Sequence, residues 1–465
     1  MNNKIFKIVG IILVIGVCLS SCGISKNYQA PAMEMSELYR DANTTDTASI
    51  ATLPYSTLFK DKKLQKLIAE GIANSYDLKV AVARIKQAEA NFNQSKLQFL
   101  PNLNASTQVT NQGLSESQSR GLSYNKNIYQ LGANASWEAD IWGKLQSAKK
   151  GELALLLQSH AYQRAVQSQL IANIANNYYN LLAMDKELEI TLKTISYLKE
   201  DISTNKLLKT ANRITEASVA QSEANLYATQ VTIPDLKYNI RQTENALSIL
   251  IARPPGSIDR NTIDEQEFDV LLQTGIPAQL LANRPDVQEA EYQLRYNFEH
   301  INNARTYFYP SLTITAQGGW QGTTAKNLFD PASLFYNLIG GLAQPIFNQG
   351  LNKQRLAIAK AQYEENTANF YSTLLAAGQE VSNALFSYQM AEEKKSSRDE
   401  QLLALGKAVD YNRELLNYGY AQTSYLDVLT SQQSYLAAQL NQVSDQLQKL
   451  TAIVNLYQSL GGGWK

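Results

Sequence analysis

The side chains best suited to metal binding or nucleophilic catalysis are scarce in this sequence of 465 residues. Its only thiols and imidazoles are those of Cys18, Cys22, His160 and His300, whereas a structural zinc site takes about four soft ligands and a catalytic one about three. Neither His has a partner at metal-ligand spacing, so each is expected on the surface or in helix packing. No nucleophile elbow, P-loop or HExxH motif occurs. The sequence therefore predicts no metal site, no other cofactor and no enzyme activity.

One of the two thiols lies in a context that predicts covalent modification. Two Lys precede an uncharged run of about twelve residues, which suits a secretory signal and is too short to span a bilayer. The run ends in Leu-Ser-Ser directly before Cys22, which resembles the bacterial lipobox, where small residues lead into a cysteine that is acylated after cleavage. We predict a signal peptide over residues 1–21 and a lipidated N-terminal tail over residues 22–61; the alternative is an ordinary signal peptide that happens to end in a cysteine. Cleavage before Cys22 would also remove Cys18 and leave no free thiol.

The charge balance argues against a nucleic-acid partner. The sequence has 42 Lys and Arg against 42 Asp and Glu, so its formal net charge is zero. Without a net positive charge the chain generates no long-range field that would concentrate phosphates. We therefore expect no nucleic acid among its partners.

The main organising feature of the sequence is an internal repeat with an offset of 209 residues. Residues 74–78 correspond to residues 283–287, and residues 100–106 correspond to residues 309–315. Self-similarity at a fixed offset indicates two copies of one structural unit. Between the copies, a Pro-Pro-Gly sequence and an acidic stretch are typical of a surface linker. The predicted segments are a first repeat over 62–253, a linker over 254–276, a second repeat over 277–460 and a C-terminal tail over 461–465.

Each copy contains a predicted β-hairpin. After Pro101 and Pro310 the hydrophobic period changes from helical to two, so we predict hairpins over residues 101–141 and 310–347. Strands of about ten residues with one apolar side suit a tilted transmembrane β-strand, and the alternative is a soluble antiparallel sheet with one wet face. Four strands are too few to close a barrel, which needs about eight. Strands that cross a membrane would therefore require several chains to share one barrel, because open edges in hydrocarbon leave backbone groups unpaired.

Most of the remaining sequence is predicted to form long helices. Residues 144–209 contain no Pro and one Gly, which permits a helix of about 100 Å, and a similar stretch follows Gly350. Helical segments over residues 62–99 and 277–308 precede the hairpins. Pro234 lies inside another predicted helix, where we expect a kink or a restart. Apolar residues recur every seven positions in two helices, which predicts coiled-coil packing: Val219, Leu226, Ile233, Ile240 and Leu247 in one, and Leu429, Leu436, Val443, Leu450 and Tyr457 in the other.

Several motifs, in their order and together with the repeat, resemble one family. They are Arg284-Pro285-Asp286-Val287, Phe308-Tyr309-Pro310-Ser311-Leu312, the stretch from Trp137 to Lys144, the stretch from Pro345 to Gly350, and the C-terminal Leu460-Gly461-Gly462-Gly463-Trp464. The chain resembles the outer-membrane efflux proteins, the TolC-like channels. Within them it is similar to the lipidated branch that works with resistance-nodulation-division pumps.

The resemblance implies a mainly α fold with a membrane β part. Long antiparallel coiled-coil helices would form a periplasmic tunnel, and four strands per chain would contribute to a twelve-stranded barrel shared by a homotrimer. The protein would be lipid-anchored in the bacterial outer membrane, extend into the periplasm, and conduct small toxic compounds passively to the exterior. Its partners would be outer-membrane lipid, a periplasmic adaptor (membrane fusion protein) and an inner-membrane resistance-nodulation-division pump. The alternatives are the exit duct of a protein-secretion system and a periplasmic coiled-coil scaffold lipoprotein.

The resemblance also points to a periplasmic gate near the turn into the last helix. In the family, polar and charged residues hold this end shut, and helix pairs move apart like an iris to open it. Asp427 matches one acidic gate position, a second acidic position falls on Thr430, and Tyr418 precedes the turn. A basic residue usual near the turn has no clear counterpart. Asp427 also fits a capping box with Ser424, in which the carboxylate favours the positive end of the helix dipole.

Overall fold

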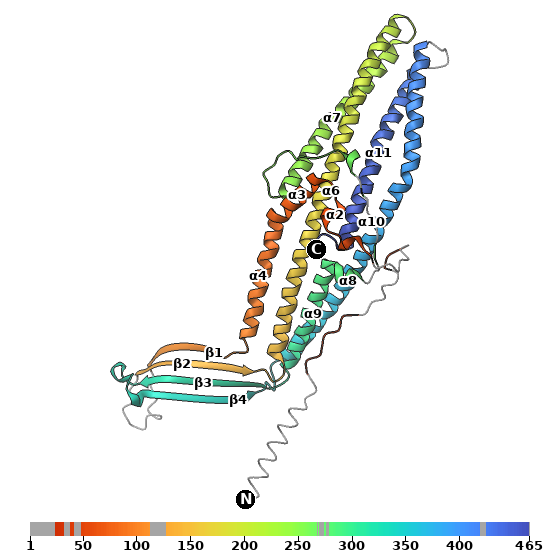
Figure 1. Ribbon diagram of the computed structural model, residues 1–465. Coiled ribbons are helices and arrows are strands. Elements are labelled where there is room, and N and C mark those ends of the chain that lie inside the picture. Colours follow the sequence, from red (N-terminus) through yellow and green to blue (C-terminus); the bar gives the residue numbers. More distant parts are fainter. Residues whose placement is uncertain are drawn as a thin grey trace. The chain divides into compact units, whose positions relative to one another are not determined.

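The structure is a computed structural model (Figure 1), which describes residues 24–31, 38–40, 48–111, 127–266, 268, 274–275, 279–418 and 425–464. The predicted signal peptide, Cys22 and the segment 419–424 lie outside these residues. The chain forms two compact units. The first unit contains Arg84–His160 and Glu289–Tyr371 with the described part of Met1–Ala32, and the second contains Ala161–Gln288 and Ser372–Lys465 with the described part of Met33–Ala83.

The first unit contains one four-stranded antiparallel sheet. Its strands are β1 (Asn102–Asn111), β2 (Asn127–Ala139), β3 (Ser311–Gly322) and β4 (Leu334–Ala343), and their spatial order is their chain order (Figure 1). Two short 3-10 helices, η4 (Ala325–Asn327) and η5 (Pro331–Ser333), lie between β3 and β4. Both predicted hairpins are present, and pairing of β2 with β3 joins them into one sheet. This unit also contains parts of four helices: α4 (Tyr76–Leu97), α6 (Lys144–Thr210), α9 (Pro285–Thr306) and α10 (Leu351–Tyr418).

The helices before the hairpins are broken at matching positions of the two repeats. In the first repeat α3 (Lys62–Asn74) and α4 (Tyr76–Leu97) are separated by Ser75, and in the second α8 (Leu280–Asn283) and α9 (Pro285–Thr306) are separated by Arg284. The sequence had predicted one continuous segment in each case. Arg284 adopts an extended conformation (φ −92°, ψ 111°) because the following proline disfavours the helical region at the residue before it. Ser75 also has an extended ψ, 132°, without a proline after it.

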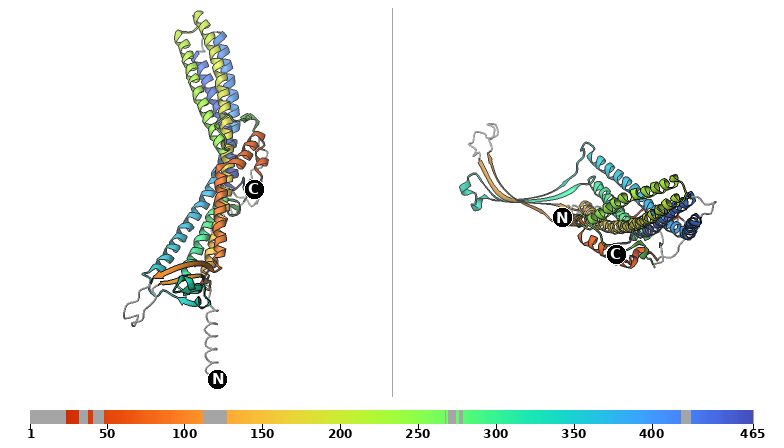
Figure 2. Two further views of the ribbon diagram at one scale, coloured as in Figure 1. Left: turned by 90° about the vertical axis from the view of Figure 1, so that its left-hand side faces the viewer. Right: turned by 90° about the horizontal axis from the view of Figure 1, so that it is seen from above.

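Two long helical hairpins dominate the second unit (Figure 2). The first is formed by α6 (Lys144–Thr210) and α7 (Glu216–Leu250), and the second by α10 (Leu351–Tyr418) and α11 (Tyr425–Ser459). Helix α6 has 67 residues and α10 has 68, which confirms the prediction of uninterrupted long helices. Among the described residues, no helix combines the length and the apolar character that crossing a bilayer requires.

The predicted seven-residue seams face the helical interior. Every member of both seams is buried or half-buried, with Val219 and Leu226 of α7 and Val443 and Leu450 of α11 among the buried ones. Helix α7 continues through Pro234 instead of restarting there. The residue before it, Ile233, packs against a buried cluster of Ile195, Leu198, Ile202 and Leu226. Tertiary packing next to the proline therefore helps to hold the helix together despite the hydrogen bond that proline removes.

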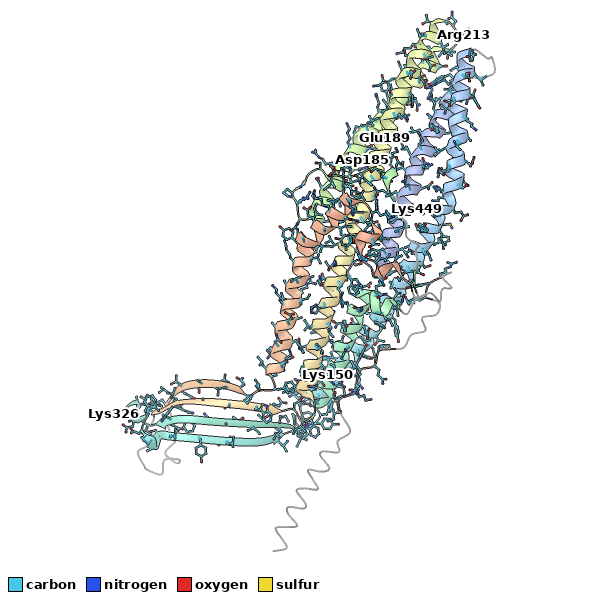
Figure 3. The ribbon with its side chains drawn as sticks, in the orientation of Figure 1. Lys150, Asp185, Glu189, Arg213, Lys326 and Lys449 are labelled. Carbon is cyan, nitrogen blue, oxygen red and sulfur yellow. The ribbon has the colours of Figure 1, made fainter. Side chains whose placement is uncertain are left out.

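The linker between the repeats is fastened to the helices of the second unit. Arg260 pairs with Asp185 of α6 and Glu244 of α7, at 2.5 and 2.6 Å; Figure 3 shows Asp185. Ile263, in the 3-10 helix η2 (Ile263–Glu265), is buried. Tyr178, which precedes Asp185 in α6, donates from its hydroxyl to Asp61 at 2.6 Å. Asp61 follows two short elements in the chain, η1 (Ile50–Thr52) and α2 (Tyr55–Leu58). The described part of the linker is thus held against the helices by Arg260 and by the buried side chains of Ile258 and Ile263, while most of its other residues are exposed.

Candidate functional site

The register of the sheet sorts its side chains by polarity. Leu103 of β1 lies opposite Ala135 of β2, Ala135 lies opposite Ala316 of β3, and Ala316 lies opposite Leu338 of β4. Because alternate residues of a strand share a face, this register gathers the apolar positions of all four strands on one side. They are Leu103, Ala105 and Val109 of β1, Tyr129, Leu131, Ala133, Ala135 and Trp137 of β2, Leu312, Ile314, Ala316 and Trp320 of β3, and Leu334, Tyr336, Leu338 and Leu342 of β4. We call this set the apolar face.

The apolar face is exposed to an unusual degree. Leu103 is 71% exposed, Val109 64%, Leu338 70% and Leu342 69%. Soluble proteins rarely leave a contiguous apolar surface of this extent uncovered. The described residues leave this face uncovered, and a lipid bilayer is a cover that such strand lengths fit.

The opposite side, which we call the polar face, consists mainly of amides and hydroxyls. Its members include Asn104, Ser106 and Gln108 of β1, Gln130, Asn134 and Ser136 of β2, Thr313, Thr315 and Gln317 of β3, and Asn337 of β4. Ile128 of β2 and Phe335 and Ile339 of β4 are exceptions. Glycines bring β2 and β3 close together on this side: a Cβ at Gly319 would collide with the carbonyl oxygen of Leu131, and a Cβ at Gly132 would lie 2.8 Å from the carbonyl oxygen of Gly318.

The junction between β2 and α6 explains the stretch from Trp137 to Lys144. Asp140 caps the start of α6, because its carboxylate accepts from the backbone N–H groups of Leu145 and Gln146 at 3.0 and 2.8 Å. The Lys144 ammonium pairs with the Glu138 carboxylate at 2.9 Å. The Trp142 indole donates to the carbonyl of Pro310 at 2.7 Å. The motif therefore fixes the direction in which the chain leaves the sheet.

The Arg284-Pro285-Asp286-Val287 motif forms a structural lock in the second unit. The Arg284 guanidinium, 9% exposed, donates to Asp286 and Glu380 at 2.8 and 2.5 Å and to the carbonyl of Ser459 at 3.0 Å. Burial alone would lower the pKa of Arg284, but the two carboxylates outweigh it and raise the pKa above its ordinary value. The C-terminal motif contacts the same place, because the Trp464 indole donates to the carbonyl of Asn283 at 2.9 Å.

A polar cluster links the two helical hairpins near the α6–α7 turn, where Figure 3 places Arg213. The Arg413 guanidinium of α10 donates to the Asp201 carboxylate of α6 at 2.7 Å, and the amide of Gln432 on α11 donates to the other oxygen of Asp201. Asp201 is only 14% exposed and Arg413 is 36% exposed. We call these three residues the hairpin clasp. Arg413 and Gln432 also line a groove of about 540 Å³ between the hairpins.

The residues that the sequence suggested for a gate lie next to the clasp in the chain, but they do not form it. Tyr418 is the last residue of α10 and is 73% exposed. Asp427 lies in the first turn of α11, and Thr430 follows one turn later; both are exposed. Asn412 donates to the backbone carbonyl of Asp427 at 3.4 Å. Ser424, the predicted capping partner of Asp427, lies outside the described residues.

Sequence reasoning missed all three clasp residues. Asp201 and Arg413 are 212 positions apart, and nothing in the local pattern of either helix connects them. Buried Tyr425 lies close by, and burial raises the pKa of its hydroxyl above the ordinary value.

The other residues that the sequence singled out for chemistry are Cys22 and the two His. Cys22 lies outside the described residues. His300 stacks on Tyr296 within α9, with ring centroids 6.2 Å apart. In the part of the chain that the structure describes, no group of three or more His, Cys, Asp or Glu side chains is placed to hold a metal ion.

Comparison with known proteins agrees with this geometry. A family model described as outer membrane efflux protein matches residues 67–253 and 276–462, once for each repeat. The cation efflux system protein CusC of Escherichia coli O6:H1 is 27% identical over 456 residues, which cover 97% of this chain and 98% of CusC. The probable outer membrane lipoprotein SilC of Salmonella typhimurium is 26% identical over 455 residues, 97% of each chain.

The fold agrees as well. A crystal structure of CusC, from a study of its folding and transmembrane channel formation, matches with a TM-score of 0.84 and 26% identity, over 95% of this chain and 100% of that chain. The family model covers both repeats and the structural match spans nearly the whole chain, including the sheet. The chain therefore belongs to the outer membrane efflux protein family.

Proposed function

We propose that the chain is the exit duct of a tripartite efflux system, a channel in the bacterial outer membrane that passively conducts small toxic compounds to the exterior. The observation that carries this proposal is the register of the sheet, which separates an exposed apolar face from a polar face across all four strands. That division suits a wall with lipid on one side and water on the other. A duct of this kind performs no bond chemistry, so we propose no enzyme activity.

The sheet requires further copies of the chain. Within the described residues β1 pairs only with β2, and β4 pairs only with β3, so two edges are open. In hydrocarbon each unpaired backbone group would cost several kcal/mol, which a closed barrel avoids. We propose a homotrimer in which β4 of one chain pairs with β1 of the next, giving twelve strands. The long helical hairpins of the three chains would continue this barrel as a periplasmic tunnel.

The partners follow from the passive character of the duct. A channel without an energy source needs a pump, and the relatives named above belong to efflux systems. We propose that a periplasmic adaptor docks the helical tunnel to an inner-membrane resistance-nodulation-division pump. The apolar face and a lipidated N-terminus would hold the duct in the outer membrane.

The lipid anchor is assigned to Cys22. The lipobox-like sequence before it supports this assignment, and so does the description of the relative SilC as a probable outer membrane lipoprotein. A Cys22→Ala variant should lose incorporation of radiolabelled fatty acid, whereas a matched Cys18→Ala variant should keep it. Acylation that persists in Cys22→Ala would refute the assignment.

We propose that the gate lies at the end of the helical hairpins that carries both the clasp and the predicted gate residues Tyr418, Asp427 and Thr430. The clasp joins α6 to α10 and α11, so an outward movement of one hairpin against the other must break it. Exposed Asp427 and Thr430, together with Tyr418, would line the opening in a trimer. The closed duct would thus be held by charge-assisted hydrogen bonds, which are stronger than bonds between neutral groups.

Membrane extraction and the oligomeric state of the purified protein test the proposal. Extraction should require detergent, and the mass of the purified protein, after subtraction of bound detergent, should equal three chains. A monomer released by salt alone would support a scaffold lipoprotein instead. A deletion strain should become more sensitive to small toxic compounds; a defect confined to secreted proteins would point to a secretion duct.

A further inference from the structure

A buried amide fixes the described N-terminal segment, residues 24–31, against helix α9. The Asn302 side chain is 0% exposed; it accepts a hydrogen bond from the backbone N–H of Lys26 at 3.1 Å and donates to the carbonyl oxygen of Lys26 at 2.9 Å. Two residues later, Tyr28 meets Phe298 edge to face, with ring centroids 5.6 Å apart. The segment therefore has a defined position on α9, and Ile24, at its start, follows Cys22 by only two residues.

The same amide brings two cationic residues together. Besides the bond from Lys26, the Oδ1 atom of Asn302 accepts a hydrogen bond from the Arg305 guanidinium at 3.2 Å. This partner is neutral, so it does not offset the positive charge of Arg305, and Lys26 is exposed. Glu299, a carboxylate in the same hydrogen-bond network, is 3% exposed and has two other cations as charged neighbours. The outer surface at this place therefore carries positive charge.

A cavity of about 300 Å³ lies between these cations and two aromatic rings. It is lined by Ile24, Lys26, Arg305, Phe308 and Tyr309. Both rings are 41% exposed, and that of Tyr309 contacts Trp142, with centroids 5.2 Å apart. Exposed aromatic rings beside cations are typical of the boundary between lipid headgroups and hydrocarbon. The lining of the cavity thus suits a ligand that is anionic at one end and apolar at the other.

The cavity also lies at the depth of a lipid headgroup if the apolar face spans the hydrocarbon. Tyr309 precedes Leu312, the first residue of the apolar face in β3, by three positions, which a chain spans in at most about 10 Å. The polar region of each leaflet is roughly 5 to 7 Å thick. The phosphates of the periplasmic leaflet are therefore within reach of the cavity, and acyl chains on Cys22 would enter the same leaflet.

We propose that this cavity binds the phosphate of a phospholipid from the periplasmic leaflet, with Arg305 and Lys26 as its ligands and the acyl chains of that lipid on the apolar face. The proposal rests on the outer-membrane channel proposed above. The planar fork of donors on Arg matches phosphate oxygens, and Lys adds a point charge. A lipid with net negative charge should bind more tightly than a zwitterionic one, whose own cation offsets its phosphate.

Native mass spectrometry of the acylated full chain in detergent tests the proposal, because it reports assembly and bound lipid together. The protein is titrated with phosphatidylglycerol, which is anionic, and with phosphatidylcholine, which is zwitterionic. Arg305→Gln should lower the affinity for phosphatidylglycerol about tenfold, since a charge-assisted bond to phosphate is lost. Arg305→Lys keeps the charge and should retain most of the affinity. Equal binding of the two lipids by wild type would contradict recognition by charge.

A second variant leaves the hydrogen bonds of the segment in place. The bonds between Asn302 and residue 26 use the backbone, so Lys26→Gln removes only the charged side chain. It should weaken phosphatidylglycerol binding in trimers of normal yield. Lys326→Gln is the matched control, because it removes one cation from η4, at the end of the sheet away from the helices (Figure 3). An equal loss in Lys326→Gln would show an effect of net charge alone and overturn the site.

The remaining outcomes separate the lipid from a free anion and this proposal from the channel. Excess inorganic phosphate should not displace phosphatidylglycerol from wild type, because it lacks acyl chains; displacement would assign the cavity to a free anion and overturn the proposal. Trimers that bind the lipid equally in wild type, Lys26→Gln and Arg305→Gln would overturn it while the channel stands. A wild type that is a soluble monomer without detergent would overturn both proposals.

Discussion

Single polar contacts in this protein join segments that lie far apart in the sequence. Asp201 connects three helices through Arg413 and Gln432, and Arg284 connects the start of α9 to α10 and to the end of α11. The two sites differ in burial. Arg284 is 9% exposed, as expected for a permanent lock, whereas Arg413 is 36% exposed and adjoins a groove, as expected for a contact that must open.

Loss of the clasp is expected to favour the open duct. In Arg413→Gln the charge-assisted bond to Asp201 disappears, and a bond to a charged group contributes about 1.5 kcal/mol, so the open probability should rise about tenfold. Single-channel recording measures this directly. Arg398→Gln is the matched control, because Arg398 pairs with Asp445 at 2.8 Å within the α10–α11 hairpin and does not reach α6. Equal effects of the two substitutions would argue against a role of the clasp in gating.

Loss of the Arg284 lock is expected to destabilise the fold rather than open the duct. Arg284→Gln leaves the buried carbonyl of Ser459 without its donor and removes both carboxylate pairs. The free energy of unfolding should fall by about 3 kcal/mol. Denaturant titration followed by circular dichroism reports the change, and Arg253→Gln, which removes a more exposed pair with Glu70, should cost much less. A loss no larger than that of Arg253→Gln would contradict the lock.

A buried carboxylate in the first unit predicts a pH effect. Glu299 of α9 is only 3% exposed, and burial raises its pKa above the ordinary value of 4.5. The folded state is therefore disfavoured while Glu299 is charged and regains stability as the pH falls through the raised pKa. Glu299→Gln should melt at a higher temperature than wild type at pH 7, and the difference should vanish below the unfolded pKa of 4.5. Exposed Glu365 provides the control: a Glu365→Gln difference with the same pH dependence would contradict this explanation.

At the level of elements, the local sequence pattern predicted the strands and the long helices, because these depend on local interactions. Period two marked three strands clearly and β4 less cleanly, and the absence of Pro marked α6 and α10. The offset of 209 residues holds in the structure, since α9 and α11 begin 209 residues after α4 and α7. The pairing of β2 with β3, the clasp and the Arg284 lock could not be predicted, because their partners are distant in sequence. The break at Ser75 also escaped prediction, since no proline follows it.

The close approach of β2 and β3 depends on glycine. In Gly319→Ala the new Cβ would collide with the carbonyl oxygen of Leu131, so the β2–β3 register must shift or open. Gly318→Ala, at the preceding position of the same inner strand, brings its Cβ only to 3.5 Å from the carbonyl oxygen of Phe335, an ordinary van der Waals contact, and serves as the control. Gly319→Ala should therefore yield much less detergent-stable trimer on native gels, whereas Gly318→Ala should resemble wild type. Equal trimer yields would show that the β2–β3 contact tolerates a side chain.

At the level of the whole molecule, the separation of polar and apolar side chains explains the composition. A formal net charge of zero accompanies strands made almost entirely of uncharged residues. Two copies of one layout supply two β-hairpins and two helical hairpins, which is too little sheet to close and far more helix than a compact core needs. The chain is therefore one part of a larger assembly, which we propose is a trimeric channel.

Electrical recording tests this claim most directly. The full chain, purified in detergent and added to one side of a planar lipid bilayer, should produce stepwise increases in current, each step corresponding to one inserted trimer. The Arg413→Gln variant, which loses the clasp, should spend more time in the open level. Folded, membrane-inserted protein that carries no current, in wild type and in this variant alike, would contradict the account.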